Sequence, residues 1–242
     1  MKKIKTLSGS DRSEIVVSAV RTLFRSIEDI GKSKQNVVVS LSGGRSVRQF
    51  YATIAEKADL LSQDFWNKLH IFWTDERLVS PESDQSNYAM ARDLMLNRLL
   101  NVGLLDRSQV HRFPGESQNV RGSLAQYEKE LKRVSRGKVH LPILGVGQDG
   151  HVGSLFPRSP HFSRTDKYFL LVDDSPKPPK RRITVSPELI RNSPYPFLFF
   201  FGEEKRDAYE CFRDERKDYS DCPCKLALSG HPGTCFVLTD LN

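Results

Sequence analysis

Residues 145–157 read GVGQDGHVGSLFP and place an aspartate and a histidine two residues apart among glycines. Glycine adds backbone freedom and no side-chain contact, so this composition is poorly suited to packing. An imidazole titrates near neutral pH and is the commonest general acid or base, and a nearby carboxylate orients it. We therefore predict that His151 is catalytic and that Asp149 supports its ring.

The same stretch contains Ser154, which raises the alternative of a serine nucleophile. The surrounding residues GHVGSLF do not form the G-x-S-x-G turn of serine hydrolases, so this alternative is disfavoured. The remaining five histidines lack any comparable neighbourhood, and we interpret them as surface or core residues: His70, His111, His140, His161 and His231.

Two further polar stretches follow apolar runs. In SLSGGRS (40–46), Ser42, Gly43 and Gly44 suit an anion site, because glycine lets backbone N–H groups turn toward a ligand. An ordinary tight turn is the alternative, since the stretch matches no nucleotide-binding motif. In WTDERLVS (73–80), Arg77 suits a phosphate or carboxylate and Asp75 suits hydroxyl groups, whereas a surface ion pair is the alternative reading.

The elements that must position these residues alternate along the chain. Helical spacing of apolar residues predicts helices over 11–30, 46–61, 86–100, 123–134 and 203–215, with Ser86 as a cap. Short apolar runs predict strands over 36–41, 69–74, 141–146, 167–174, 181–186, 196–202 and 234–240, the first beginning near residue 36. This alternation predicts an α/β fold, a mainly parallel Rossmann-like sheet with helices on both faces, formed by residues 1–242 as a single domain.

Such a sheet binds ligands beyond the carboxyl ends of its strands. The three polar stretches follow strands 36–41, 69–74 and 141–146, so we expect them to converge at one edge. Residues 175–182, SPKPPKRR, form the clearest proline-rich loop of the chain.

Composition and charge limit the classes of partner that the chain could bind. The net charge of +7 is compatible with nucleic acid, an acidic membrane surface or a small anion. No nucleic-acid-binding motif is present, and no apolar run approaches the roughly 20 residues of a membrane helix, so we expect neither partner. No signal-like apolar segment follows the basic N-terminus, which favours a cytoplasmic location. The four cysteines do not have zinc-site spacing, and we expect free thiols and no metal: Cys211, Cys222, Cys224 and Cys235.

Five segments, in order, resemble the 6-phosphogluconolactonase family: SLSGGRS, WTDERLVSPESDQSNY, LGVGQDGHVGSLFP, RRITVSPELI and FFGEEKR. The resemblance covers nearly the whole chain and implies the NagB/RpiA/CoA-transferase-like fold that this family shares with glucosamine-6-phosphate deaminase. The deaminase pattern continues D-G-H with I-A-F-N-E-P and has D-E-Y in place of DER. Both differences favour the lactonase.

The resemblance implies hydrolysis of 6-phospho-D-glucono-1,5-lactone to 6-phospho-D-gluconate, the second step of the oxidative pentose phosphate pathway. His151 would activate a water, and no cofactor would be needed. Arg182 and Lys205 match family positions for the phosphosugar, whereas Lys180 and Arg181 are interpreted as surface residues. We expect a monomer.

The chain departs from the family pattern at Arg45, where the glycine loop usually reads S-G-G-S-T-P. Arg45 either contacts the phosphate or points to solvent. His140 stands near a position that is often acidic in the family. The alternatives are a glucosamine-6-phosphate deaminase or isomerase and a non-catalytic phosphosugar-sensing domain.

Overall fold

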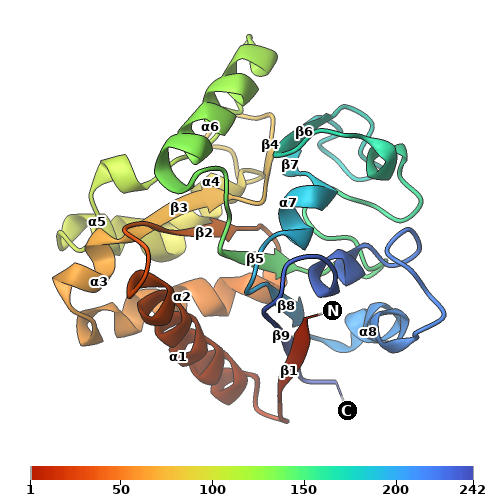
Figure 1. Ribbon diagram of the computed structural model, residues 1–242, viewed down its shortest axis with the longest axis horizontal. Helices are drawn as coiled ribbons and strands as arrows, with labels where there is room; N and C mark the ends of the chain where they lie inside the picture. Colours follow the sequence, from red (N-terminus) through yellow and green to blue (C-terminus); the bar gives the residue numbers. More distant parts are fainter. Residues whose placement is uncertain (1, 242) are drawn as a thin grey trace.

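The centre of the molecule is a six-stranded sheet with strand order β1-β9-β8-β5-β2-β3 (Figure 1). The computed structural model describes residues 2–241. All neighbouring strands of this sheet are parallel, which confirms the predicted fold class. The strands are β1 (Lys3–Ser8), β2 (Val37–Leu41), β3 (Leu69–Trp73), β5 (Leu141–Gly145), β8 (Phe197–Phe200) and β9 (Thr234–Thr239).

Both faces of the sheet are covered by helices because the central strands are apolar on both sides. Successive side chains of a strand point to opposite faces. In β2, Val37, Val39 and Leu41 join one core, and Val38 joins the other. The first core includes α1 (Arg12–Gly31), α2 (Arg48–Lys57), α3 (Gln63–Asn67) and residues of the helical run from α4 (Asn87–Ala91) to α5 (Asn97–Asn101). The second includes α6 (Val120–Ser135), α7 (Pro187–Arg191) and α8 (Arg206–Arg213).

The predicted helix starts are confirmed at two caps. The Asp11 carboxylate accepts a hydrogen bond from the backbone N–H of Ser13, and the Ser86 hydroxyl accepts one from Ala89. Such caps satisfy backbone donors that a helix leaves unpaired at its first turn.

A second, antiparallel sheet lies beside the first and has strand order β4-β7-β6. It contains β4 (Asp75–Arg77), β6 (Phe169–Val172) and β7 (Arg182–Val185). The TDER stretch is therefore partly a strand, where the sequence indicated a polar segment after β3. In the register of this sheet Arg77 lies opposite Arg182, so the pairing brings together residues more than a hundred positions apart.

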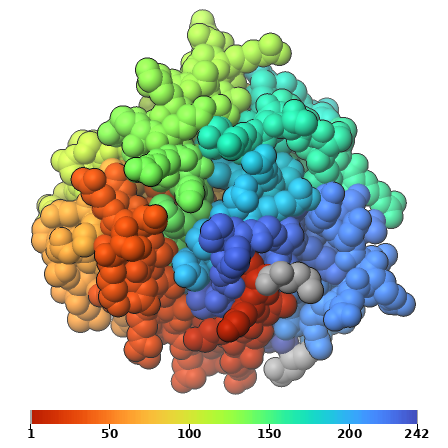
Figure 2. Space-filling view, viewed as in Figure 1, coloured from red at the N-terminus to blue at the C-terminus, as the bar shows by residue number. Residues whose placement is uncertain are grey.

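The prediction that the first strand begins near residue 36 is wrong. Strand β1 pairs in parallel with β9 at the edge of the main sheet, and Figure 2 shows the N-terminal segment beside the C-terminal one. Its residues KIKTLS are mostly exposed and include only two apolar residues, Ile4 and Leu7. An edge strand needs no continuous apolar run, and its lysines discourage pairing with another chain, so the pattern carries little strand signal.

The four cysteines are free thiols, as predicted. Among residues 2–241, no helix has both the length and the apolar character to cross a membrane.

Candidate active site

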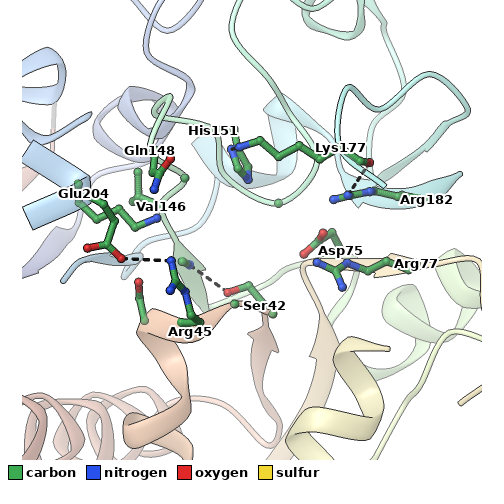
Figure 3. A pocket seen from close by; sticks show the side chains of 17 residues that line it. Ser42, Arg45, Asp75, Arg77, Val146, Gln148, His151, Lys177, Arg182 and Glu204 are labelled. Atoms are coloured by element: carbon green, nitrogen blue, oxygen red, sulfur yellow. Dashed lines mark hydrogen bonds and ion pairs between the residues drawn. The ribbon is translucent and has the colours of Figure 1, made fainter. Parts of the chain in front are cut away.

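Four adjacent parallel strands, in the order β8-β5-β2-β3, end at one edge of the sheet, and the segments that follow them enclose a cavity of about 300 Å³ (Figure 3). Figure 3 shows His151 on the opposite side of this cavity from Ser42 and Arg45. The predicted site residues that line it are Ser42, Gly43, Gly44, Asp75, Arg77, His151, Arg182 and Lys205. The convergence expected from strand order is therefore present.

His151 and Asp149 form a close pair. Asp149 stands behind the ring, with its Oδ1 2.5 Å from His151 Nδ1. The turn that carries them needs Gly147, because a Cβ there would lie 1.9 Å from His151 Nδ1. The backbone N–H of Gly147 also donates to the carbonyl of His151, which closes the turn. Glycine at this position lets the ring fold back over the loop.

The environment keeps His151 neutral near pH 7. Burial lowers the pKa of His151 below its ordinary value, and this effect outweighs the opposing influence of the Asp149 carboxylate. Burial alone would raise the pKa of Asp149, but its hydrogen bond to His151 and the nearby Lys177 hold that pKa well below the usual range. An ionised Asp149 accepts the Nδ1 proton, so Nε2 keeps the lone pair that a general base requires.

Lys177 is a site residue that the sequence reasoning missed. Its ammonium lies 3.2 Å from Asp149 Oδ2 and 3.4 Å from His151 Nδ1. Because Nδ1 is much closer to the carboxylate, we assign its proton to the bond with Asp149 and the ammonium contact to the other carboxylate oxygen. Lys177 belongs to the proline-rich loop, and no local pattern distinguished it from the other lysines there.

Arg182 fixes that loop. Its guanidinium donates to the carbonyls of Pro179 at 2.8 Å and Lys177 at 2.9 Å. Arg182 is nearly buried, and burial lowers its pKa despite the attraction of Asp75. Part of its hydrogen-bonding capacity therefore positions Lys177. Lys180 and Arg181 are exposed, as predicted.

Asp75 is buried and held from two sides. The Ser154 hydroxyl donates to one carboxylate oxygen at 3.0 Å, and the Asn87 side-chain amide donates to the other at 3.2 Å. Ser154 is fully buried and does not line the cavity, which disfavours the nucleophile alternative further. Asn87 also packs on the glycine loop, because a Cβ at Gly43 would lie 1.9 Å from its oxygen.

Cations surround the rest of the cavity. Arg77 donates to the carbonyl of Gln85 through Nη1, while its buried Nε has no hydrogen-bond partner among residues 2–241. Burial lowers the pKa of Lys205, and the positive charges of Lys177 and Arg45 add to this effect against the attraction of Glu204. Such a group of half-buried positive charges favours an anionic ligand.

Arg45 lies at the edge of the cavity and is mostly exposed. Its guanidinium forms an ion pair of 3.3 Å with Glu204, which joins the segment after β2 to the segment after β8 (Figure 3). Gly44, immediately before it, has φ +103°, a conformation that glycine adopts readily. Both alternatives for Arg45 from the sequence involved only phosphate or solvent, so this ion pair was not foreseen.

No group of three or more His, Cys, Asp or Glu side chains within residues 2–241 has an arrangement that would hold a metal ion. The donors around the cavity are instead suited to a polar, anionic organic molecule.

Known proteins resemble this chain over most of its length. The glucosamine-6-phosphate isomerase/6-phosphogluconolactonase family matches residues 10–236. The chain is 32% identical over 203 residues to a probable chloroplastic 6-phosphogluconolactonase of Oryza sativa, covering 78% of this chain and 60% of that one. It is 30% identical over 207 residues to a 6-phosphogluconolactonase of Mycobacterium tuberculosis, covering 82% and 81%.

A crystal structure of 6-phosphogluconolactonase from Thermotoga maritima superposes with a TM-score of 0.78 at 26% identity, covering 98% of this chain and all of that one. The chain thus spans about 60% of the length of the rice relatives and nearly the full length of the Thermotoga protein. The family match, the bacterial relative and the shared fold lead to one conclusion: the chain belongs to the glucosamine-6-phosphate isomerase/6-phosphogluconolactonase family.

Proposed function

We propose that this protein is a 6-phosphogluconolactonase, which hydrolyses 6-phospho-D-glucono-1,5-lactone to 6-phospho-D-gluconate in the oxidative pentose phosphate pathway. The observation that carries the proposal is the position of His151. A neutral imidazole, oriented by Asp149, faces a cavity that Arg77, Lys205 and Lys177 make positive. The named activity of the relatives supports the same substrate.

In the proposed reaction Nε2 of His151 removes a proton from a water molecule, and the resulting hydroxide attacks C1 of the lactone. The carbonyl is already electrophilic, so no covalent enzyme intermediate is required. As the tetrahedral intermediate collapses, the imidazolium returns the proton to the ring oxygen and the C1–O5 bond breaks. Asp149 stabilises the imidazolium that forms in between, in the manner of the third member of a triad.

The remaining groups would hold the substrate. Lys205 and Arg77 are the cations that we assign to the phosphate. The side-chain ammonium of Lys205 has no hydrogen bond or ion pair within residues 2–241, and Arg77 has an unused buried Nε. We expect Asp75 to accept hydrogen bonds from sugar hydroxyls. Backbone N–H groups of the loop at Ser42–Gly44 are candidates for stabilising the developing oxyanion.

The test is a coupled assay in which freshly generated lactone is hydrolysed in the presence and absence of the protein, against its spontaneous hydrolysis. Replacing the base by His151→Ala should lower kcat by about 10²–10⁴-fold and change KM little. His231→Ala is the matched control, because His231 is exposed and outside the cavity. Near-full turnover by the His151 variant would contradict the mechanism.

The alternatives give different results in the same samples. A deaminase would release ammonia from glucosamine 6-phosphate, and a sensor would bind phosphosugars without turnover. The single domain, the monomeric state and the cytoplasmic location stay predictions. Size-exclusion chromatography tests the monomer. The similar rice proteins are named as chloroplastic.

A further inference from the structure

Three of the four cysteines converge behind the catalytic turn. Cys222 and Cys224 are fully buried, and their sulfur atoms lie 3.5 Å apart. Cys211, on α8, lies close enough to Cys222 for each thiol to shift the pKa of the other. Cys235, on β9, is near enough to Cys224 to influence its pKa, and it is not counted in this thiol cluster. The proposed hydrolysis uses none of these sulfur atoms.

The thiol cluster contacts the residue between the catalytic pair. Gly150, which separates Asp149 from His151, has φ +80° and accepts a hydrogen bond of 3.0 Å through its carbonyl from the backbone N–H of Cys224. A Cβ at Gly150 would lie 3.4 Å from the sulfur of Cys222. The backbone of the catalytic turn therefore rests directly on both cysteines, and a change in their spacing acts on His151 through one residue.

The thiols of the cluster differ in reactivity. The hydrogen bond from Cys224 lowers the pKa of Cys222 against the effect of burial, and Cys211 and Lys225 lower it further. Burial raises the pKa of Cys235 to about 12 and that of Cys224 well above its ordinary value, so Cys222 is the thiol that reacts first with an oxidant. Cys222 is fully buried, whereas its neighbour Cys211 is only half-buried and lines an open groove of about 590 Å³. Entry of a small oxidant past Cys211 is therefore part of the proposal.

We propose that Cys222 and Cys224 form a reversible redox site that controls the catalytic turn, and its effect on turnover rests on the proposed function. With hydrogen peroxide as oxidant, the Cys222 thiolate displaces hydroxide from the peroxide and becomes a sulfenic acid. The Cys224 sulfur then attacks Cys222, water leaves and a disulfide forms. In total, two thiols and one peroxide give one disulfide and two waters. A dithiol reductant restores both thiols by exchange.

Closing this bond brings two sulfur atoms from 3.5 Å to about 2.05 Å. The movement is shared between two residues that touch Gly150, one of them through a backbone hydrogen bond. A displacement of roughly 1 Å at catalytic groups lowers turnover by as much as ~10²-fold. We expect oxidation to lower lactonase activity by about tenfold or more.

The first arm of the test is independent of activity. The full-length protein is treated with hydrogen peroxide, its remaining thiols are counted after denaturation, and the peptides are mapped by mass spectrometry. The wild-type protein should lose two thiols to a Cys222–Cys224 bond, and the control Cys235→Ser should lose the same two. Cys222→Ser and Cys224→Ser should form no such bond. Four remaining thiols in the wild type, or a bond between Cys211 and Cys222, would overturn the assignment without any variant having to fold.

The second arm measures lactone hydrolysis before oxidation, after it and after reduction with dithiothreitol. The switch is supported if the wild type and Cys235→Ser lose lactonase activity on oxidation and regain it on reduction. The activity of Cys222→Ser should stay close to that of its own untreated sample. A mapped disulfide with unchanged turnover would overturn the coupling to the catalytic turn. A reduced protein without any lactonase activity would instead refute the proposed function, while the thiol count would still decide the redox chemistry.

Discussion

His151 acts as a base in this proposal because two opposing effects leave it neutral yet oriented. Burial disfavours the charged ring, and Asp149 holds the Nδ1 proton so that Nε2 keeps a free lone pair. Lys177 reinforces this state, since its ammonium neutralises the second oxygen of Asp149. The pair therefore has the protonation state and orientation that a general base requires before the substrate binds.

Lys205 gives a test at the residue scale. Lys205→Met keeps the stem and removes the charge, and the lost charge-assisted contact to phosphate is worth about 1.5–3 kcal/mol. KM for the lactone should therefore rise by roughly 10- to 100-fold while kcat changes little. Steady-state kinetics of the coupled assay measure both parameters.

Lys180→Met is the matched control, because Lys180 is exposed and does not line the cavity. An unchanged KM in the Lys205 variant, or an equal rise in both variants, would remove Lys205 from the phosphate site.

At the scale of elements, the site depends on the short sheet that contains β4. This sheet holds Arg77 opposite Arg182, and the helix start at Ser86 brings Asn87 against both Asp75 and the glycine loop. Glu76, between the two site residues of β4, accepts hydrogen bonds from the backbone N–H groups of Asn87 and Tyr88. The glycine loop, β4 and the helix that starts at Ser86 thus contact one another and together support Asp75.

Gly43→Ala tests this support. The new methyl group would lie 1.9 Å from the Asn87 oxygen, so either the glycine loop or Asn87 must move, and Asp75 loses its alignment. We expect kcat/KM to fall by at least about tenfold, following the sensitivity of catalysis to small displacements. Kinetic assays and a thermal melt measure the effect on activity and on folding.

Gly9→Ala is the control, since its nearest neighbour would be at an ordinary 3.8 Å. A Gly43 variant with wild-type kinetics would show that the contact between Asn87 and the loop has no role in positioning Asp75.

Two buried histidines make the stability of the whole molecule depend on pH. Burial lowers the pKa of His140 to about 4, and burial followed by the neighbouring His70 lowers that of His111 to about 4. Their unfolded value is near 6.5. Between these pKa values the unfolded chain binds more protons than the folded one. The contribution of the two histidines to the free energy of unfolding is therefore fully present above pH 6.5 and is lost as the pH falls toward 4.

The loss should be on the order of 2–3 kcal/mol per histidine, measured as the free energy of unfolding in urea at pH 7, 6, 5 and 4.5. His140→Asn is the informative variant, because Nδ1 of His140 accepts a hydrogen bond from the Val38 N–H and an amide oxygen replaces that acceptor without titrating. Its stability should fall less steeply with pH than that of the wild type. Parallel pH profiles would contradict the assignment.

The features that the sequence predicted depend on local interactions, whereas the features that only the tertiary structure showed depend on long-range ones. Apolar periodicity is local, and it was enough for the parallel sheet, the main helices and the polar strand ends where Ser42, Asp75 and His151 meet. It failed for β1, which is mostly exposed and has no buried run to reveal a strand.

The chain pattern alone therefore predicted the fold class and identified the glycine-flanked histidine as a candidate base, because residue type and spacing carry both. Only the tertiary structure decided that Lys177 lies beside Asp149, that Asn87 occupies the space left by Gly43, and that Cys222 and Cys224 lie beneath Gly150. Each of these contacts joins segments distant along the chain. Which residues come into contact depends on how the two sheets and their helices pack, and local sequence periodicity carries no information about that packing.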